Sequence, residues 1–431
     1  MNTITLPSNL KGFINTNTEE KTTKSERQIY LIEGRLKKQD QICPVCGLKM
    51  HIHDTYNVSL NHLPLGFTLS VVKLPKHRYI CPECKTTRME EVAFQAEGHR
   101  ITIPLLNFTE GLLQHGLTLK DVSFLTGLGK NVVKEIDKRR LQGLYCRESS
   151  TEWEVPSETP KVIGIDEFKL HDGYKYATVI LSMETGHVLY LAKGKKKQVV
   201  YDFINFVGDE WMGNVEAVCC DMNSDFQEAF EEKYPHIQCV YDYFHIKKNL
   251  NDKVISAIRK EEQQRLIDEG NEEQAKMLKK TKFILTSSRT TLEEKDKKKG
   301  TSYLEKYESI IKENKLLFTA DIVKEKLTYA YSLKDECEMS KEITEIMDIC
   351  RATKNKHFIW FANLLDNHFE GIVAHGYYSL SSGKVEGTNN MIKTIRRQGY
   401  GYPDDDYFFL KVFDASRRTY IRNPKSHKIR D

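Results

Sequence analysis

The sequence predicts a multidomain protein of mixed α/β class. Its 431 residues are enough for two or more domains of roughly 100–200 residues each. Two Cys-x-x-Cys motifs near the N-terminus are typical of a small metal-bound domain. After residue 161, short β-branched runs alternate with helical patterns, which indicates a sheet packed with helices. A long stretch rich in Lys and Glu follows with a helical period, so we expect it to interrupt the sheet domain.

Composition narrows the class of protein and its compartment. Hydrophobic residues make up 39% of the chain and charged residues 29%, which is typical of a soluble globular protein with exposed helices. No apolar run approaches the roughly 20 residues that a membrane span needs, and the N-terminus has no signal-peptide core. We therefore expect a cytoplasmic protein whose ten cysteines are thiols or metal ligands rather than disulfides. The net charge of +4 is only a weak argument for a nucleic-acid partner.

Two segments are predicted to lie outside the folded domains. Residues 1–40 are polar and charged with little hydrophobic periodicity, so we expect a mobile lead-in or a short helix. Residues 148–160 contain two prolines among Ser, Thr and Glu, which is typical of a linker.

A zinc ribbon is predicted at residues 41–98. The pairs Cys43/Cys46 and Cys81/Cys84 supply four thiolates, which is the ligand set of a closed structural zinc site. The residues between the two pairs alternate between apolar and polar as strands do. A pair of redox dithiols is the alternative, and we expect zinc with four cysteine ligands. Four histidines also lie between the motifs, and one could replace a thiolate: His51, His53, His62 and His77.

Residues 99–147 contain a helix-turn-helix pattern. Thr118 is placed to cap a first helix, and Gly127 and Gly129 make the turn before a second, basic helix. The second helix would bind DNA; an ordinary pair of packing helices is the alternative. Its polar faces carry Lys130, Asn131, Lys134, Lys138, Arg139 and Arg140.

Residues 161–245 show the pattern of a mixed sheet. The expected elements are strands at 162–166, 174–183, 187–193, 215–221 and 237–242, with helices at about 197–212, 224–233 and from 245. Three of these strands end on an aspartate: Asp166, Asp221 and Asp242. An acid at the end of a buried strand is held rigidly and can still face a cleft, although aspartate also ends strands merely as a turn residue. Asp225, four residues after Asp221, is an alternative second acid, and Asp221 is preferred because it ends the strand.

The chain becomes helical from residue 246 to about 375 and then reaches a further polar helix in the segment 376–431. Residues 246–375 are nearly free of proline and have apolar residues four apart, so we read them as an all-α insertion. In the later helix, Val385, Thr388, Ile392 and Ile395 form an apolar stripe. A solvated helix face is the alternative to a functional role for the adjacent stripe, which contains Glu386, Asn390, Lys393 and Arg397.

Asp166, Asp221 and Glu386 together would suit divalent-metal chemistry. Hard cations such as Mg²⁺ prefer carboxylate oxygens and keep positions for water and phosphate. Two such ions about 4 Å apart can activate an attacking hydroxyl and stabilise the leaving oxygen of an in-line displacement. Spacing alone does not establish that the three acids converge.

The motifs resemble, in order and spacing, those of bacterial DDE insertion-sequence transposases of the ISL-three type. The resemblance begins with the double Cys-x-x-Cys at residue 43, continues through the helix-turn-helix, and ends at about residue 401. Its later part consists of Gly-Ile-Asp166-Glu-Phe, Cys-Asp221-Met, Asp242-Tyr-Phe-His245-Ile and Val-Glu386-Gly-Thr-Asn-Asn-Met-Ile-Lys.

The resemblance implies a fold and a set of site residues. The fold would be an RNase-H-like catalytic domain, made of residues 161–245 and 376–431 and interrupted by the insertion. Asp166, Asp221 and Glu386 would be the catalytic triad that binds Mg²⁺ or Mn²⁺. Asp242 and His245 match the family's Cys/Asp-x-x-His signature near the site, where His245 would contact DNA or orient an acid. A purely structural role at the start of a helix is the alternative for His245.

The resemblance also implies a function. The chain would bind the terminal inverted repeats of an insertion sequence, cleave phosphodiester bonds, and join the freed 3′ ends to target DNA. Partners would be double-stranded DNA and further copies of the chain, in a dimer or larger assembly at the bacterial nucleoid, with no membrane. Phosphate contacts are expected from Asn390, Lys393, Arg396 and Arg397. A zinc-containing DNA-binding regulator and a stand-alone metal-dependent nuclease are the rival functions.

Overall fold

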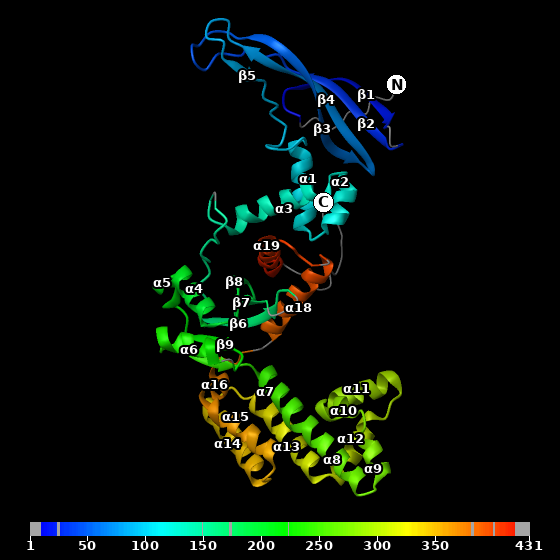
Figure 1. The fold of residues 1–431 in the computed structure, drawn as a ribbon, viewed down its shortest axis with the longest axis vertical. Coiled ribbons are helices and arrows are strands. Elements are labelled where there is room, and N and C mark those ends of the chain that lie inside the picture. The colour runs from blue at the N-terminus through cyan, green and yellow to red at the C-terminus, as the bar shows by residue number, and fades with distance from the viewer. Residues whose placement is uncertain are drawn as a thin grey trace, which may run out of the picture. The chain divides into compact units, whose positions relative to one another are not determined.

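The computed structural model describes residues 10–23, 26–148, 150–171, 175–222, 224–380, 383–399 and 401–418. The chain divides into two compact units, shown in Figure 1. The first contains Met1–Glu154 and Arg397–Leu410, and the second contains Val155–Arg396 and Lys411–Asp431. The division thus falls within the segment expected to be a linker. None of the described helices is both long and apolar enough to cross a membrane.

The first unit opens with a five-stranded mixed sheet. β1 (Phe13–Thr22) pairs antiparallel with β2 (Gln28–Leu36), which pairs in parallel with β4 (Thr68–Ile80). The expectation of a mobile lead-in or a short helix over residues 1–40 is therefore wrong where β1 and β2 lie. The reason is that β1 lies at the sheet edge with nearly all its side chains exposed, so its sequence carries no apolar alternation.

The predicted alternation between the two cysteine pairs is confirmed as a long hairpin. β3 (His51–Leu65) pairs antiparallel with β4, and β5 (Thr87–Met89) pairs antiparallel with the C-terminal end of β4. The sheet has its own apolar core, made of Ile32, Leu60, Val72, Leu74, Val92 and Phe94.

Three helices complete the first unit. They are α1 (Ile103–Gln114), α2 (Leu119–Thr126) and α3 (Lys130–Tyr145). The predicted cap of α2 is confirmed, because the Thr118 side chain accepts a hydrogen bond from the backbone N–H of Asp121. Gly127 ends α2 in the left-handed conformation at φ 70°, which a residue with a side chain rarely adopts. The helix α1 was not foreseen from the sequence.

The second unit is built on a sheet with strand order β10-β9-β6-β7-β8. Its strands are β6 (Val162–Lys169), β7 (Tyr176–Ser182), β8 (Val188–Lys193), β9 (Ala217–Cys220) and β10 (Gln238–Tyr241). β6, β7 and β8 form an antiparallel meander, whereas β9 and β10 run parallel to β6. The five strands occur where the sequence predicted them, with one correction. β6 continues three residues beyond Asp166, because Glu167, Phe168 and Lys169 still pair with β7.

Helices cover both faces of this sheet (Figure 1). On one face, the side chains of Ile163, Ile165 and Val218 pack into a core with α4 (Lys197–Val207), α5 (Asp209–Met212) and α6 (Ser224–Lys233). On the other face lies α18 (Gly383–Gln398), followed in the chain by α19 (Asp405–Ser416). Ser381 and Ser382, either of which the sequence allows as a cap of α18, lie outside the described residues.

The regular elements described between β10 and α18 are all helices, as the period predicted. α7 (Tyr243–Asn249) continues through a π-helical turn at Leu250–Ile255 into α8 (Ser256–Asp268). The remaining helices are α9 (Glu272–Leu278), α10 (Lys282–Thr286), α11 (Arg289–Lys299), α12 (Tyr303–Glu313), α13 (Lys315–Ala330), α14 (Glu336–Ala352), α15 (Lys356–Asn367), α16 (Phe369–Val373) and α17 (His375–Tyr378).

Candidate catalytic site and zinc site

Continued past the last paired residues, the register of three parallel strands puts three aspartates at matching positions along the sheet. Gly164 of β6 opposes Cys219 of β9, so the same register continued by two residues opposes Asp166 to Asp221. Cys220 opposes Tyr241 of β10, so one further residue opposes Asp221 to Asp242. Residues opposed on parallel strands point to the same side of the sheet. The register also favours Asp221 over Asp225, because Asp225 lies in α6 and outside this row.

Helix α18 lies close to this row because of Gly164. A Cβ atom at Gly164 would lie 2.7 Å from Sδ of Met183 and 3.2 Å from Cγ2 of Val385, so the glycine leaves room for α18 to approach. The side chain of Lys384 donates hydrogen bonds to the carbonyls of Met183 and Glu184 after β7. Gly164 and Asp166 share a face of β6, so the first two turns of α18 lie beside Asp166.

Asp166 is half-buried, and both of its carboxylate oxygens are engaged. Oδ1 accepts a hydrogen bond from the backbone N–H of Glu167 at 2.7 Å, and Oδ2 accepts one from Nδ2 of Asn389 on α18. Burial raises the pKa of Asp166, although the Glu167 N–H, the nearby His245 and the Asn389 amide act in the opposite direction. The charge of Asp221 raises this pKa further, which indicates two carboxylates close enough to repel each other.

Asp221 forms an ion pair with His245 of α7. The distance from its Oδ1 to Nδ1 of His245 is 2.9 Å, and the same oxygen accepts the backbone N–H of Met222 at 2.7 Å. Burial opposes ionisation of both groups, but the hydrogen bond and the opposite charges of the pair have the larger effect. The pKa of Asp221 is therefore lowered and the pKa of His245 is raised. Asp242 caps α7, since its carboxylate accepts the N–H of Phe244 at 2.9 Å. The Asp-x-x-His motif thus fixes the start of the helix that carries His245.

Glu386 occupies a different position from the two aspartates. It lies on the exposed side of α18, one residue after Val385, which is buried against the sheet. Among the described residues, one group of three or more His, Cys, Asp or Glu side chains has all its ligand atoms within 4.8 Å of one another, and that group is the zinc cysteines. Asp166, Asp221 and Glu386 therefore do not converge to that distance. The predicted polar stripe is exposed at Asn390, Lys393 and Arg397, while Arg396 donates to the backbone carbonyl of Lys169 at 2.7 Å.

Three of the five cations predicted on the second helix of the helix-turn-helix are partly buried and paired with acidic side chains of the first unit. Lys134 and Lys138 pair with the carboxylate of Asp404 at 3.0 and 2.9 Å. The side chain of Arg140 is only 11% exposed and pairs with the buried Asp137 at 3.0 Å. The residues of the predicted set that remain exposed on α3 are Lys130, Asn131 and Arg139.

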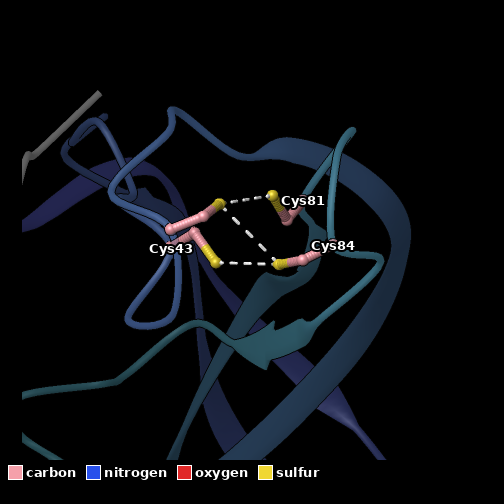
Figure 2. A group of neighbouring side chains, drawn as sticks. Cys43, Cys81 and Cys84 are labelled. Atoms are coloured by element: carbon pink, nitrogen blue, oxygen red, sulfur yellow. Dashed lines mark hydrogen bonds between the residues drawn. The ribbon is translucent and has the colours of Figure 1, made fainter.

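The four predicted zinc ligands converge. The sulfur atoms of Cys43, Cys46, Cys81 and Cys84 all lie within 4.8 Å of one another, and Figure 2 shows those of the labelled residues facing a common centre. Cys43 and Cys81 are buried. Hydrogen bonds with Thr86 lower the pKa of the Cys84 thiol to about 6, which favours the thiolate that a metal requires. None of the four histidines between the pairs belongs to this group, as expected.

Sequence reasoning missed Asn389. It selected Asn390, which is exposed, whereas Asn389 is the neighbour that contacts Asp166. A signal was present, since Asn389 is four residues after Val385 and so shares its side of the helix.

Comparison with known proteins assigns the chain to a family. The ISL3 family of DDE transposases, described as "Transposase", matches residues 163–412, and a family described as the zinc-finger of transposases IS204, IS1001, IS1096 and IS1165 matches residues 39–84. Because the first match spans more than half of the sequence, the chain belongs to the ISL3 family of insertion-sequence transposases. The four-cysteine cluster of the first unit is the zinc ribbon of this family.

Individual relatives agree with this assignment. The chain is 25% identical over 372 residues to the transposase for insertion sequence element IS1001 of Bordetella parapertussis, which covers 86% of this chain and 87% of that protein. It is 24% identical over 261 residues to the transposase for IS1557 of Mycobacterium tuberculosis, covering 56% of each. Among solved structures, a Drosophila P element transposase strand transfer complex aligns with 75% of this chain and 94% of its own at 12% identity and a TM-score of 0.41.

Proposed function

We propose that this transposase binds the terminal inverted repeats of its insertion sequence and catalyses divalent-metal-dependent DNA cleavage and strand transfer. Asp166, Asp221 and Glu386 would form its DDE triad. The observation that carries the proposal is the row of aspartates defined by the register of β6, β9 and β10, with α18 packed on β6 beside Asp166. Membership of the ISL3 family supports it.

The second unit would be an RNase-H-like catalytic domain. Its support is the strand order, an antiparallel meander of three strands extended by two parallel strands on the side of the first. Residues 161–245 and 376–431 would make up this domain, and residues 246–375 would be an all-α insertion. The other proposed divisions are a zinc ribbon at 41–98 and a helix-turn-helix at 99–147.

The donor atoms at the aspartate row fit Mg²⁺ or Mn²⁺. Both ions prefer oxygen ligands, and the row offers the carboxylates of Asp166, which lies within β6, and of Asp221, which follows β9 directly. A bound ion would supply activation of the attacking hydroxyl and stabilisation of the leaving oxygen. The residues of the chain position this chemistry: the N–H of Glu167 and the amide of Asn389 hold Asp166, while His245 holds Asp221. His245 would orient Asp221, and Asp242 would hold the start of α7, the helix that carries His245.

DNA binding would fall to the zinc ribbon, the helix pair α2–α3 and the exposed face of α18. On α3 the exposed Lys130 and Asn131 lie at the N-terminal end, which is the end of a recognition helix that contacts base edges. Lys134, Lys138 and Arg140 would contribute less, because each has an acidic partner within the unit. On α18, phosphate contacts would come from Asn390, Lys393 and Arg397. Two transposon ends must be held together, so the active species would be a dimer or larger assembly.

A cleavage assay tests the proposal. A labelled duplex carrying the element's own end would be incubated with purified full-length protein and Mg²⁺, Mn²⁺ or chelator. We expect nicking at the repeat boundary with either metal, and its loss in Asp166→Asn, Asp221→Asn and Glu386→Gln while end binding persists. Asp225→Asn is the matched control, an acid four residues from Asp221 that should retain cleavage.

The rival functions give different results in the same assay. Specific end binding without cleavage in any metal would indicate a regulator. Cleavage without joining of the freed 3′ ends to target DNA would indicate a nuclease. Loss of cleavage in Asp225→Asn with retention in Asp221→Asn would reassign the second acid.

A further inference from the structure

Asn389 is the residue of α18 that contacts the aspartate row directly. Its Nδ2 donates to Oδ2 of Asp166, and its Oδ1 is buried without a hydrogen-bond donor among the described residues. Buried side-chain oxygens are almost always paired, because leaving one unpaired costs about 1–3 kcal/mol. An orphaned oxygen beside an acidic residue therefore requires an explanation.

Exchanging the oxygen and nitrogen of the Asn389 amide would not remove the unpaired atom. An ionised carboxylate only accepts hydrogen bonds, so the Asn389 group that faces Asp166 must be the NH₂. Since Oδ1 and Nδ2 share one carbon atom, the unpaired oxygen then stays at the edge of the same carboxylate. The close approach of Val385 to Gly164, one turn earlier, keeps the backbone of Asn389 near β6.

An oxygen in this setting has the properties of a ligand for a hard cation. Amide carbonyl oxygens of Asn and Gln are common ligands of such ions, together with carboxylates. A neutral oxygen also adds a ligand without adding a further negative charge to a site where Asp166 and Asp221 already repel each other.

We propose that Asn389 has two roles at the metal site: its Nδ2 positions the carboxylate of Asp166, and its Oδ1 is a neutral ligand of the divalent cation. This inference rests on the proposed metal-dependent function and adds a residue to it. It also explains how α18 contributes to the metal site although Glu386 lies on the exposed side of the helix.

Direct metal binding tests this proposal without DNA and without turnover. Mn²⁺ would be titrated into the zinc-loaded full-length protein, with free Mn²⁺ measured by electron paramagnetic resonance. The test variant is Asn389→Leu, which keeps the shape of the side chain and removes both polar atoms. Gln398→Leu is the matched control, because it makes the same kind of change at an exposed amide of the same helix. Asp166→Asn reports whether the measured site is the aspartate row.

We expect Asn389→Leu to weaken Mn²⁺ binding by about 10–100-fold, the range seen when a group supporting a metal ligand is lost. Gln398→Leu should bind Mn²⁺ as the wild type does. Asn389→Asp distinguishes ligation from helix docking. The carboxylate introduced beside Asp166 should lower the melting temperature of the metal-free protein, and bound Mn²⁺ should restore that temperature. Asn389→Asp should bind Mn²⁺ at least tenfold more tightly than Asn389→Leu.

Three results would overturn the inference. Binding of Mn²⁺ by Asn389→Leu at wild-type affinity, with loss in Asp166→Asn, would remove Asn389 from the site and leave the proposed function intact. Equal weakening in Asn389→Leu and Asn389→Asp would assign Asn389 to docking of α18 alone. A wild-type protein that binds no Mn²⁺ would overturn ligation by Asn389, while the cleavage assay decides the proposed function separately.

Discussion

Substitution of Gly164 by alanine tests whether the approach of α18 to β6 governs the site. Gly164 lies on the face of β6 that carries Asp166, and α18 packs directly on it. An added methyl group would fall 2.7 Å from Sδ of Met183 and 3.2 Å from Cγ2 of Val385, whereas ordinary contacts are 3.4–4 Å. Both neighbours must therefore move.

The expected magnitude follows from which neighbour can move. Met183 is flexible and can change rotamer, but Val385 is branched and can yield only if α18 shifts by a few tenths of an ångström. Overpacking of this kind costs about 1–3 kcal/mol. Four residues after Val385, the shift displaces Asn389 from Asp166, and we expect DNA cleavage to fall by about tenfold, since misplacement by 1 Å can cost about 100-fold.

The assay combines local stability with cleavage. Because the two units need not unfold together, hydrogen exchange of α18 peptides measures the local effect, and urea unfolding measures the global one. Gly387→Ala is the control. It lies on the same helix with nothing within 4 Å of an added Cβ, and should stabilise α18 by about 0.5–1 kcal/mol. Unchanged exchange in α18 and unchanged cleavage by Gly164→Ala would refute the argument that this glycine sets the helix position.

Three further predictions concern other parts of the molecule. Lys138 and Lys134 outweigh burial and hold the pKa of Asp404 at about 2. Asp404→Asn should thus destabilise the first unit by about 1 kcal/mol at pH 7. In urea titrations at different pH, the full difference in unfolding free energy should be seen above about pH 4, the ordinary pKa of an unfolded aspartate, and it should disappear toward pH 2. A difference that does not change with pH would contradict this prediction. Cys46→Ser should abolish the zinc measured by mass spectrometry and unfold the ribbon, since a structural zinc supplies about 10–16 kcal/mol of binding free energy; full zinc retention would exclude Cys46 as a ligand. Lys324, 3% exposed, donates to Tyr307 at 2.7 Å and pairs with Asp321 at 3.2 Å. Lys324→Met should cost about 1–3 kcal/mol in urea unfolding, because Asp321 keeps its partner Arg289; a loss no larger than that of the exposed Lys312→Met would show the network to be dispensable.

Local features of the sequence predicted most of the individual elements. The zinc cysteines were predictable because each pair lies within one tight turn, and the family's ribbon matches them. The strands that precede Asp221 and Asp242 were predictable because short buried runs of apolar residues are visible without knowledge of their partners. The family resemblance was likewise contained in the order of the motifs.

Other properties depended on partners distant in the sequence, so only the tertiary structure decided them. β1 is a strand because β2 supplies its hydrogen bonds, although its exposed side chains give no alternation. Lys134 and Lys138 look like free cations until Asp404 is brought beside them. The choice between Asn389 and Asn390 depends on about 100° of helix rotation, which the close contact of Val385 with Gly164 determines. The sequence by itself thus determined most of the elements and the family, while packing between distant segments decided which polar side chain faces Asp166.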